Sequence, residues 1–130
     1  VGGSGNNTLI GGLSNNVLIG GGGSNKLYSR PIGQSTNNGA GSLMIGGTTI
    51  YNGNEAILES ILEQWNAPLD YNTRIANLTS GNNPYHVTLN SSTVLRENAT
   101  DQLFASGSDW LWNISGHSKL NGRKSTMRVN

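Results

Sequence analysis

The amino-acid sequence predicts a mainly β fold: a short parallel β-solenoid of the β-roll kind, joined to an α+β segment of two helices and a few strands. The first 28 residues repeat in register with a period of nine, and residues 54–65 change to helical spacing. The composition agrees, since 19 glycines and as many asparagines accompany only 34% hydrophobic residues. Short repeated units bury their apolar side only by stacking on one another, so the period decides the fold class.

Each nine-residue unit contains a glycine pair, a small polar turn, an asparagine at the sixth place and a leucine at the eighth. Glycine and asparagine tolerate the positive φ angles that such a turn needs. The next three residues form a short strand whose leucine points inward. The repeat core is therefore predicted as one inward stripe of Leu9, Leu18 and Leu27, continued by Met44. The turn ladder is predicted to contain Asn6, Asn7, Asn15, Asn16 and Asn25, with Asn6, Asn15 and Asn25 in nearly equivalent places.

The unit resembles the RTX (repeats-in-toxin) nonapeptide, Gly-Gly-x-Gly-x-Asp-x-hydrophobic-x. The resemblance implies that turn aspartates and nearby carbonyls hold calcium between coils. Here the sixth place is taken by Asn6 or Asn16, and by Asn25 in the third copy, and residues 1–54 contain no carboxylate. Calcium affinity depends on ligand charge, whereas stacked asparagines can hydrogen-bond to one another. We interpret the turns as metal-free asparagine ladders, with weak calcium sites as the alternative.

A wider resemblance covers nearly the whole chain. The order of its short motifs is similar to that of a C-terminal module on large bacterial surface and secreted proteins with RTX-like repeats. This resemblance implies an extracellular or cell-surface location and a non-catalytic role. The motifs are Gly46–Tyr51, a helix ending at Leu62–Trp65, Tyr71, Arg74, Leu78, Leu89–Asn90, Thr93–Val94, Asp101, Leu103 and Asp109–Trp110.

The middle of the chain contains an interruption and two helices. Residues 29–39 break the repeat, which resumes at Ser42–Gly47. Asn54 is expected to cap a helix whose apolar stripe ends at Trp65, and the glutamates opposite that stripe are expected to be a solvated face. A second helix is expected from Asp70, as its cap, through Leu78. We expect this pair to cover the open end or a side of the solenoid, because repeat arrays need caps.

The last third is predicted to be β-rich. Residues 85–89 and 92–96 are expected to form strands, and residues 101–112 a degenerate repeat coil. Asp101 and Asp109 are the carboxylates in this repeat-like turn and the best calcium candidates, and the alternative is that each caps its own turn. The expected organisation is residues 1–50 as solenoid, 51–80 as helical cap and 81–130 as β-rich segment, packed as one domain.

Several function classes find no support in the residues. The chain has no cysteine, its two histidines, His86 and His117, form no zinc pattern, and no nucleophile–base set can be assembled, so we expect no enzyme. A net charge of +1 argues against nucleic acid as partner, and no apolar run is long enough for a membrane span. The acid-free tail with Lys119, Arg123, Lys124 and Arg128 suits either a solvated end or an acidic surface or polysaccharide.

The sequence therefore predicts a non-catalytic extracellular structural module on the bacterial cell surface. The first unit begins at Gly2, so we expect the partner to be another copy, stacked head to tail into a filament or matrix, or neighbouring coils of a longer parent chain. One alternative is a calcium-binding RTX-type module that folds on secretion. Another is a glycan-binding adhesin, with aromatic stacking platforms that would otherwise be core residues: Trp65, Trp110, Trp112 and Tyr85.

Overall fold

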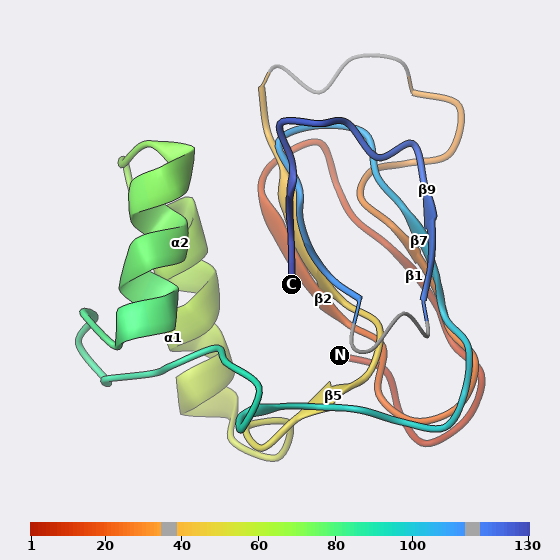
Figure 1. Ribbon diagram of the computed structural model, residues 1–130, viewed down its shortest axis with the longest axis horizontal. Coiled ribbons are helices and arrows are strands. Elements are labelled where there is room, and N and C mark those ends of the chain that lie inside the picture. Colours follow the sequence, from red (N-terminus) through yellow and green to blue (C-terminus); the bar gives the residue numbers. More distant parts are fainter. Residues whose placement is uncertain (35–38, 114–117) are drawn as a thin grey trace.

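The computed structural model describes residues 1–34, 39–113 and 118–130 and contains two four-stranded sheets beside two helices (Figure 1). The strands are β1 (Thr8–Ile10), β2 (Asn16–Ile19), β3 (Lys26–Tyr28), β4 (Ser42–Ile45), β5 (Thr48–Thr49), β6 (Val94–Leu95), β7 (Gln102–Phe104), β8 (Trp110–Trp112), β9 (Lys119–Asn121) and β10 (Arg128–Val129). The helices are α1 (Glu55–Asn66) and α2 (Tyr71–Ser80).

Successive repeat strands go to opposite sheets. The first sheet has the order β1-β3-β7-β9 and the second has the order β10-β8-β4-β2, and all pairs in both are parallel. Thr8 lies opposite Lys26 in the first sheet, so strands stack after two nine-residue units. One unit therefore supplies a strand to one sheet, and the next unit supplies a strand to the other.

The two sheets enclose an apolar interior. Leu27 and Leu103 of the first sheet pack in one cluster with Leu18, Met44 and Leu111 of the second. The prediction of a single inward stripe was therefore wrong: the leucines form two facing stripes, because alternate units belong to opposite sheets. Leu9, on the edge strand β1, is half-buried against the same cluster.

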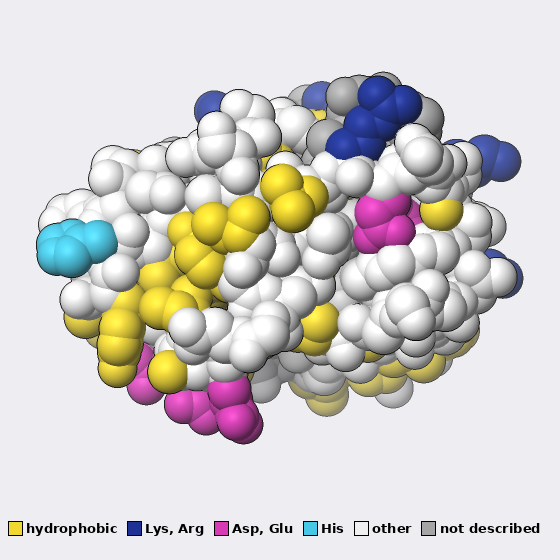
Figure 2. Space-filling model, turned by 90° about the horizontal axis from the view of Figure 1, so that it is seen from below, with side chains coloured by type: hydrophobic (Ala, Val, Ile, Leu, Met, Phe, Trp, Pro, Cys, Tyr) yellow, Lys and Arg dark blue, Asp and Glu magenta, His cyan; other side chains and the backbone are white. Residues whose placement is uncertain are grey.

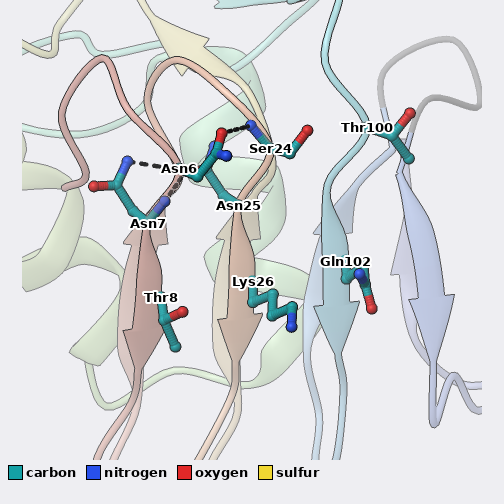
Figure 3. A pocket seen from close by; sticks show the side chains of 8 residues that line it. All are labelled: Asn6, Asn7, Thr8, Ser24, Asn25, Lys26, Thr100 and Gln102. Carbon is teal, nitrogen blue, oxygen red and sulfur yellow. Dashed lines mark hydrogen bonds between the residues drawn. The ribbon is translucent and has the colours of Figure 1, made fainter.

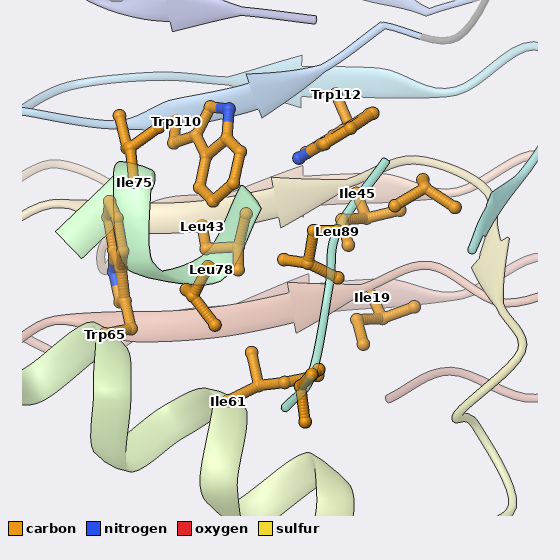
Figure 4. Close-up of a cluster of buried hydrophobic side chains, with 12 residues drawn as sticks. Ile19, Leu43, Ile45, Ile61, Trp65, Ile75, Leu78, Leu89, Trp110 and Trp112 are labelled. Atoms are coloured by element: carbon orange, nitrogen blue, oxygen red, sulfur yellow. The ribbon is translucent and has the colours of Figure 1, made fainter. Parts of the chain in front are cut away.

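The helices cover the outer face of the second sheet. Its two central strands, β4 and β8, are buried on both faces, and the side chains that alternate with the interior ones form a second cluster with the helices (Figure 4). The members with the lowest exposure are Ile19, Leu43, Ile45, Ile61, Trp65, Leu78, Leu89 and Trp110. The predicted caps are confirmed, since the Asn54 side chain accepts from the Ile57 N–H and that of Asp70 accepts from the Thr73 N–H. The pair thus covers a side of the two-sheet body.

Residues 48–97 are an insertion between two stacked coils. β3 pairs directly with β7 and β4 with β8, so strands after the insertion continue both sheets. The chain leaves and returns along a two-stranded antiparallel ribbon of β5 and β6. The insertion is also tied to the last strand, because the Tyr71 hydroxyl donates to the Asp109 carbonyl (2.8 Å) and accepts from the Arg128 N–H (2.8 Å).

The expected strand at residues 85–89 is wrong. Val87 and Leu89 are buried as the alternation predicts, but no strand forms there. The Asn83 side chain instead accepts from the Val87 N–H (2.9 Å) and donates to the Val87 carbonyl (2.8 Å), which replaces a partner strand. The expected strand at residues 92–96 is shorter, at Val94–Leu95. Residues 35–38 of the repeat interruption lie outside the described residues.

Candidate functional site

The turn of the first unit is organised around the side-chain amide of Asn7. Its Nδ2 lies 3.2 Å from the Gly3 carbonyl oxygen, 2.6 Å from that of Gly5 and 3.3 Å from that of Gly20. It also lies 2.9 Å from Oδ1 of Asn25 in the next coil. We call this arrangement, one amide nitrogen among oxygens of two successive coils, an amide cage (Figure 3).

The second unit repeats the cage on the opposite sheet. Asn16 Nδ2 lies 3.2 Å from the carbonyl oxygen of Gly12, 2.7 Å from that of Ser14 and 3.4 Å from that of Ser29, and its two hydrogens are shared among these acceptors. Its fourth acceptor is the Ser42 hydroxyl at 3.2 Å, which takes the place that Asn25 has in the first cage. Ser42 was expected only as the start of the resumed repeat, although its position directly before Leu43 matches that of Asn16 before Val17 and places it in the ladder.

The third unit has the same geometry with a carboxylate as acceptor. Asn25 Nδ2 donates to the carbonyls of Gly21 (3.3 Å) and Gly23 (2.8 Å) and to Oδ1 of Asp101 (3.0 Å). Asn25 Oδ1 accepts from both N and Nδ2 of Asn7, which fixes the orientation of this buried amide. The three cages therefore form two ladders that run along the turns of the two sheets.

The equivalent asparagines are Asn7, Asn16 and Asn25, so the expected grouping of Asn6 and Asn15 with Asn25 was wrong. Asn6 and Asn15 occupy the preceding place of each unit. Asn6 Oδ1 accepts from the Ser24 N–H (2.8 Å), and Asn15 Oδ1 accepts from the Gly41 N–H (2.9 Å). Each of them links its own coil to the next coil of the same sheet with one hydrogen bond.

The first glycine of each unit allows the coils to approach closely. A Cβ on Gly20 would lie 2.1 Å from the Gly46 carbonyl oxygen and 2.8 Å from Asn25 Nδ2. Gly2 and Gly11 have the same surroundings, with carbonyl oxygens of the next coil at 2.0 and 2.6 Å from the ideal Cβ. Any side chain at these places would push the cages apart.

The two aspartates continue different ladders and share no turn. Asp101 Oδ1 accepts from N (2.8 Å) and Nδ2 (3.0 Å) of Asn25. Asp109 Oδ1 accepts from the Ser42 N–H (2.6 Å), while its Oδ2 accepts from the N–H groups of Ser106 (2.7 Å) and Gly107 (3.3 Å). The picture of two carboxylates in one small loop was therefore wrong, and Asp109 has the geometry of a turn cap.

The carboxylate of Asp101 occupies the position in the first ladder that the side-chain amide of an asparagine has in the preceding coils. Its Oδ2 lies 2.7 Å from an ideal Cβ on Gly46, whereas Asn25 Nδ2 lies 2.8 Å from that on Gly20. Burial raises the pKa of Asp101, although hydrogen bonds from Asn25 act in the opposite direction. Burial and the nearby charge of Asp101 also raise the pKa of Glu97, whose Oε1 is buried without a hydrogen-bond partner among the described residues.

We expect Asp101→Asn to stabilise the protein at pH 7 in the presence of a chelator. An acid with a raised folded pKa holds its proton more tightly in the folded state, so its contribution to stability falls as pH rises from the unfolded to the folded pKa. The variant supplies an amide in place of the buried charge, a gain of about 1 kcal/mol. Urea unfolding at pH 7 and pH 5 measures the difference in stability between the variant and the wild-type protein, which should shrink at pH 5.

Asp70→Asn is the control for the direction of this pH effect, because hydrogen bonds from Thr73 lower the pKa of Asp70 instead of raising it. A less stable Asp101→Asn protein at pH 7 would contradict this placement.

The remaining candidates of the sequence analysis lie elsewhere. Trp65, Trp110 and Trp112 are buried between the second sheet and the helices, so they cannot be sugar-stacking platforms. Tyr85 is 56% exposed, but the three buried tryptophans cannot form a sugar-binding platform with it. His86 is exposed on the insertion, and His117 lies outside the described residues. Within residues 1–34, 39–113 and 118–130, no three His, Cys, Asp or Glu side chains are grouped to hold a metal.

The fold and the cages define a class of protein: a parallel two-sheet repeat protein whose turns are joined by side-chain ladders. Residues 1–30 match the family model described as RTX calcium-binding nonapeptide repeat (4 copies), so this part of the chain is similar to RTX repeats. Searches of curated proteins and of solved structures gave no significant match. No helix in the described part of the chain is long and apolar enough to cross a membrane.

Proposed function

We propose that this protein is a non-catalytic extracellular structural module, in which the two sheets form a β-roll-type solenoid and asparagine amides replace calcium between coils. The observation that carries the proposal is the amide cage of Asn7, repeated at Asn16 and Asn25. Each Nδ2 is surrounded by carbonyl and side-chain oxygens, the type of ligand that calcium takes. Because these oxygens already accept hydrogen bonds from an amide, the coils have no need of an ion there.

The same cages support association through one edge of the two-sheet body. Asn25 Oδ1 accepts two hydrogen bonds from Asn7, whereas no donor reaches Asn7 Oδ1 within the described residues. β1 and β2 are edge strands and are therefore able to pair with a further coil. We propose that coils of the same asparagine type stack on this edge, either from another copy or from a longer parent chain.

The opposite edge is less suited to stacking. The register places Ser118 and Met127 next in the two ladders, after Asp101 and Asp109. Met127 offers a sulfur, which accepts from the Lys124 N–H at 3.3 Å, and neither residue carries an amide. This difference favours asparagine-type coils, rather than the β9–β10 end of another copy, as the partner of the β1–β2 edge.

The proposal predicts that calcium removal leaves the protein unchanged. Thermal unfolding followed by circular dichroism should give the same Tm in EGTA and in millimolar calcium, because amides occupy the cages. Negative-stain microscopy of the same samples should show assemblies that survive chelation. A protein that is unfolded in EGTA and folds when calcium is added would contradict the metal-free ladders. Monodisperse particles in both samples would contradict association between copies.

A calcium-binding module is the second candidate function, and Asp101 favours it. Burial raises the pKa of Glu97 and the nearby charge of Asp101 raises it further, so two carboxylates lie near this turn. If this turn holds calcium, the ion should raise the Tm of the wild-type protein and leave that of Asp101→Asn unchanged. The metal-free proposal expects no calcium effect on either protein.

A further inference from the structure

Charge is divided between the two parts of the molecule. Six of the eight Lys and Arg residues lie in the two-sheet body, and five of the seven Asp and Glu residues lie in the insertion at 48–97. The body has only Asp101 and Asp109 as acids, and both are buried, at 3% and 0% exposure. Its surface is therefore basic. In Figure 2 most of the visible acidic side chains lie at the lower edge of the helical part and the Lys and Arg side chains lie mainly around the strands, although one acidic group is also visible over the strand part.

The basic groups include a row on the open face of the first sheet. The helices cover the second sheet, whereas the outer face of the first sheet is uncovered by any described element (Figure 1). Lys26, Gln102 and Lys119 lie opposite one another on β3, β7 and β9. Their neighbours Leu27, Leu103 and Leu120 point into the interior, so this row points outward. Figure 3 shows Thr8, Lys26 and Gln102 side by side on three strands.

The row has a spacing that selects its partner. Lys26 and Lys119 are two strands apart, which places their Cα atoms about 10 Å from each other. Nucleic acids carry a phosphate about every 3.4 Å along each strand, a much denser charge than this row can match. A linear polysaccharide with one acidic group in alternate sugars carries charge at wider intervals, and its extended chain suits a flat face.

The face also offers polar and apolar contacts for sugars. A shallow pocket of about 290 Å³ lies beside the row and is lined by Lys26, Thr100 and Gln102 among others. On the other side of the row, the rings of Tyr28 and Phe104 stack at 4.3 Å, next to the partly exposed Arg30. The two rings cover each other, so they present an apolar ridge rather than an open ring face.

From this arrangement we infer that the outer face of the first sheet binds an anionic polysaccharide that runs across the strands. The row of Lys26, Gln102 and Lys119 contacts the acidic groups and hydroxyls, and the ridge of Tyr28 and Phe104 borders the chain. The buried tryptophans take no part. The row of Lys26, Gln102 and Lys119 lies on the outer face of the strands, whereas the pocket beside it is lined in part by Asn6, Asn7 and Asn25 of the turns.

Isothermal titration of the protein with hyaluronate, in which every second sugar carries a carboxylate, tests the inference, with dextran as the neutral polymer and duplex DNA as the dense polyanion. Binding of hyaluronate that weakens with salt is expected, together with no binding of dextran and weaker binding of DNA. Lys26→Gln/Lys119→Gln should weaken binding by at least about tenfold and reduce its salt dependence. The matched control is Arg128→Gln, an exposed charge on β10 of the second sheet, which should change binding little.

Three results would overturn the inference. They are equal loss in Arg128→Gln and in the lysine variant, no effect of the lysine variant, and tighter binding of DNA than of hyaluronate. A second copy of the protein could instead bind this face through the exposed glutamates of its helix α1: Glu55, Glu59 and Glu63. Sedimentation of the protein alone tests for such self-association. Self-association that the lysine variant abolishes, without polysaccharide binding by the wild-type protein, would assign the face to that contact instead.

Discussion

Asn25→Ala should destabilise the protein by about 3–5 kcal/mol, since it leaves several buried polar groups without partners at once. Asn25 is 1% exposed and lies at the centre of the first ladder. Its Nδ2 serves the carbonyls of Gly21 and Gly23 and the Asp101 carboxylate, and its Oδ1 accepts twice from Asn7. Urea unfolding followed by circular dichroism, in EGTA, measures the loss.

The control for this variant is Asn6→Ala. Asn6 belongs to the same turn system but is exposed, and its side chain accepts only from the Ser24 N–H among the described residues. Its removal should cost about 1 kcal/mol or less. Equal losses in the two variants would mean that the inner ladder has no special part in stability.

Trp110→Ala should cost about 3–5 kcal/mol, because it removes a fully buried tryptophan at the junction between the sheets and the insertion. Trp110 is fully buried, and its ring centroid lies 6.0 Å from that of Trp65 and 5.6 Å from that of Trp112. Its Nε1 also donates to Oδ1 of Asn130 at 2.7 Å, which fastens the last residue after β10. The change should be measured by urea unfolding and by loss of near-ultraviolet circular dichroism.

Tyr85→Ala is the matched aromatic control, since Tyr85 is 56% exposed on the insertion. Its effect should remain within about 0.5 kcal/mol, as for other surface substitutions. If Trp110→Ala were as mild as this control, the helices would not depend on the second sheet for their stability.

The nine-residue period was sufficient to predict the parallel strands, their inward leucines and the stacked asparagines, because each follows from local turn chemistry and side-chain alternation. The helix caps at Asn54 and Asp70 were also predictable, since a cap needs only its own first turn. The assignment of alternate units to two facing sheets was not. The sequence of a unit does not indicate to which sheet its strand belongs. The pairing of Thr8 with Lys26, two units further along the chain, shows that successive units alternate between the sheets.

Long-range contacts explain the other differences. Residues 85–89 alternate as a strand does, but the side chain of Asn83 satisfies the backbone of Val87, and the sequence does not reveal that choice. Asp101 and Asp109 are eight residues apart and read as one turn, although their partners Asn25 and Ser42 belong to different sheets. The close approach of Gly46 to Asp101 was not predictable either, since Asp101 follows only after the insertion.

The insertion changes how this protein should unfold. In an ordinary repeat array each coil contacts only its neighbours, so the ends can fray one coil at a time. Here Asn25 and Asp101 are 76 residues apart in sequence yet adjacent in one ladder, so closing that contact needs residues 48–97 in place. The Tyr71 hydroxyl then joins this segment to Asp109, just before β8, and to Arg128 of β10, which are the first and second strands after the insertion in the second sheet. The helices thus couple coils that would otherwise melt separately, and the whole chain is expected to denature as one cooperative unit.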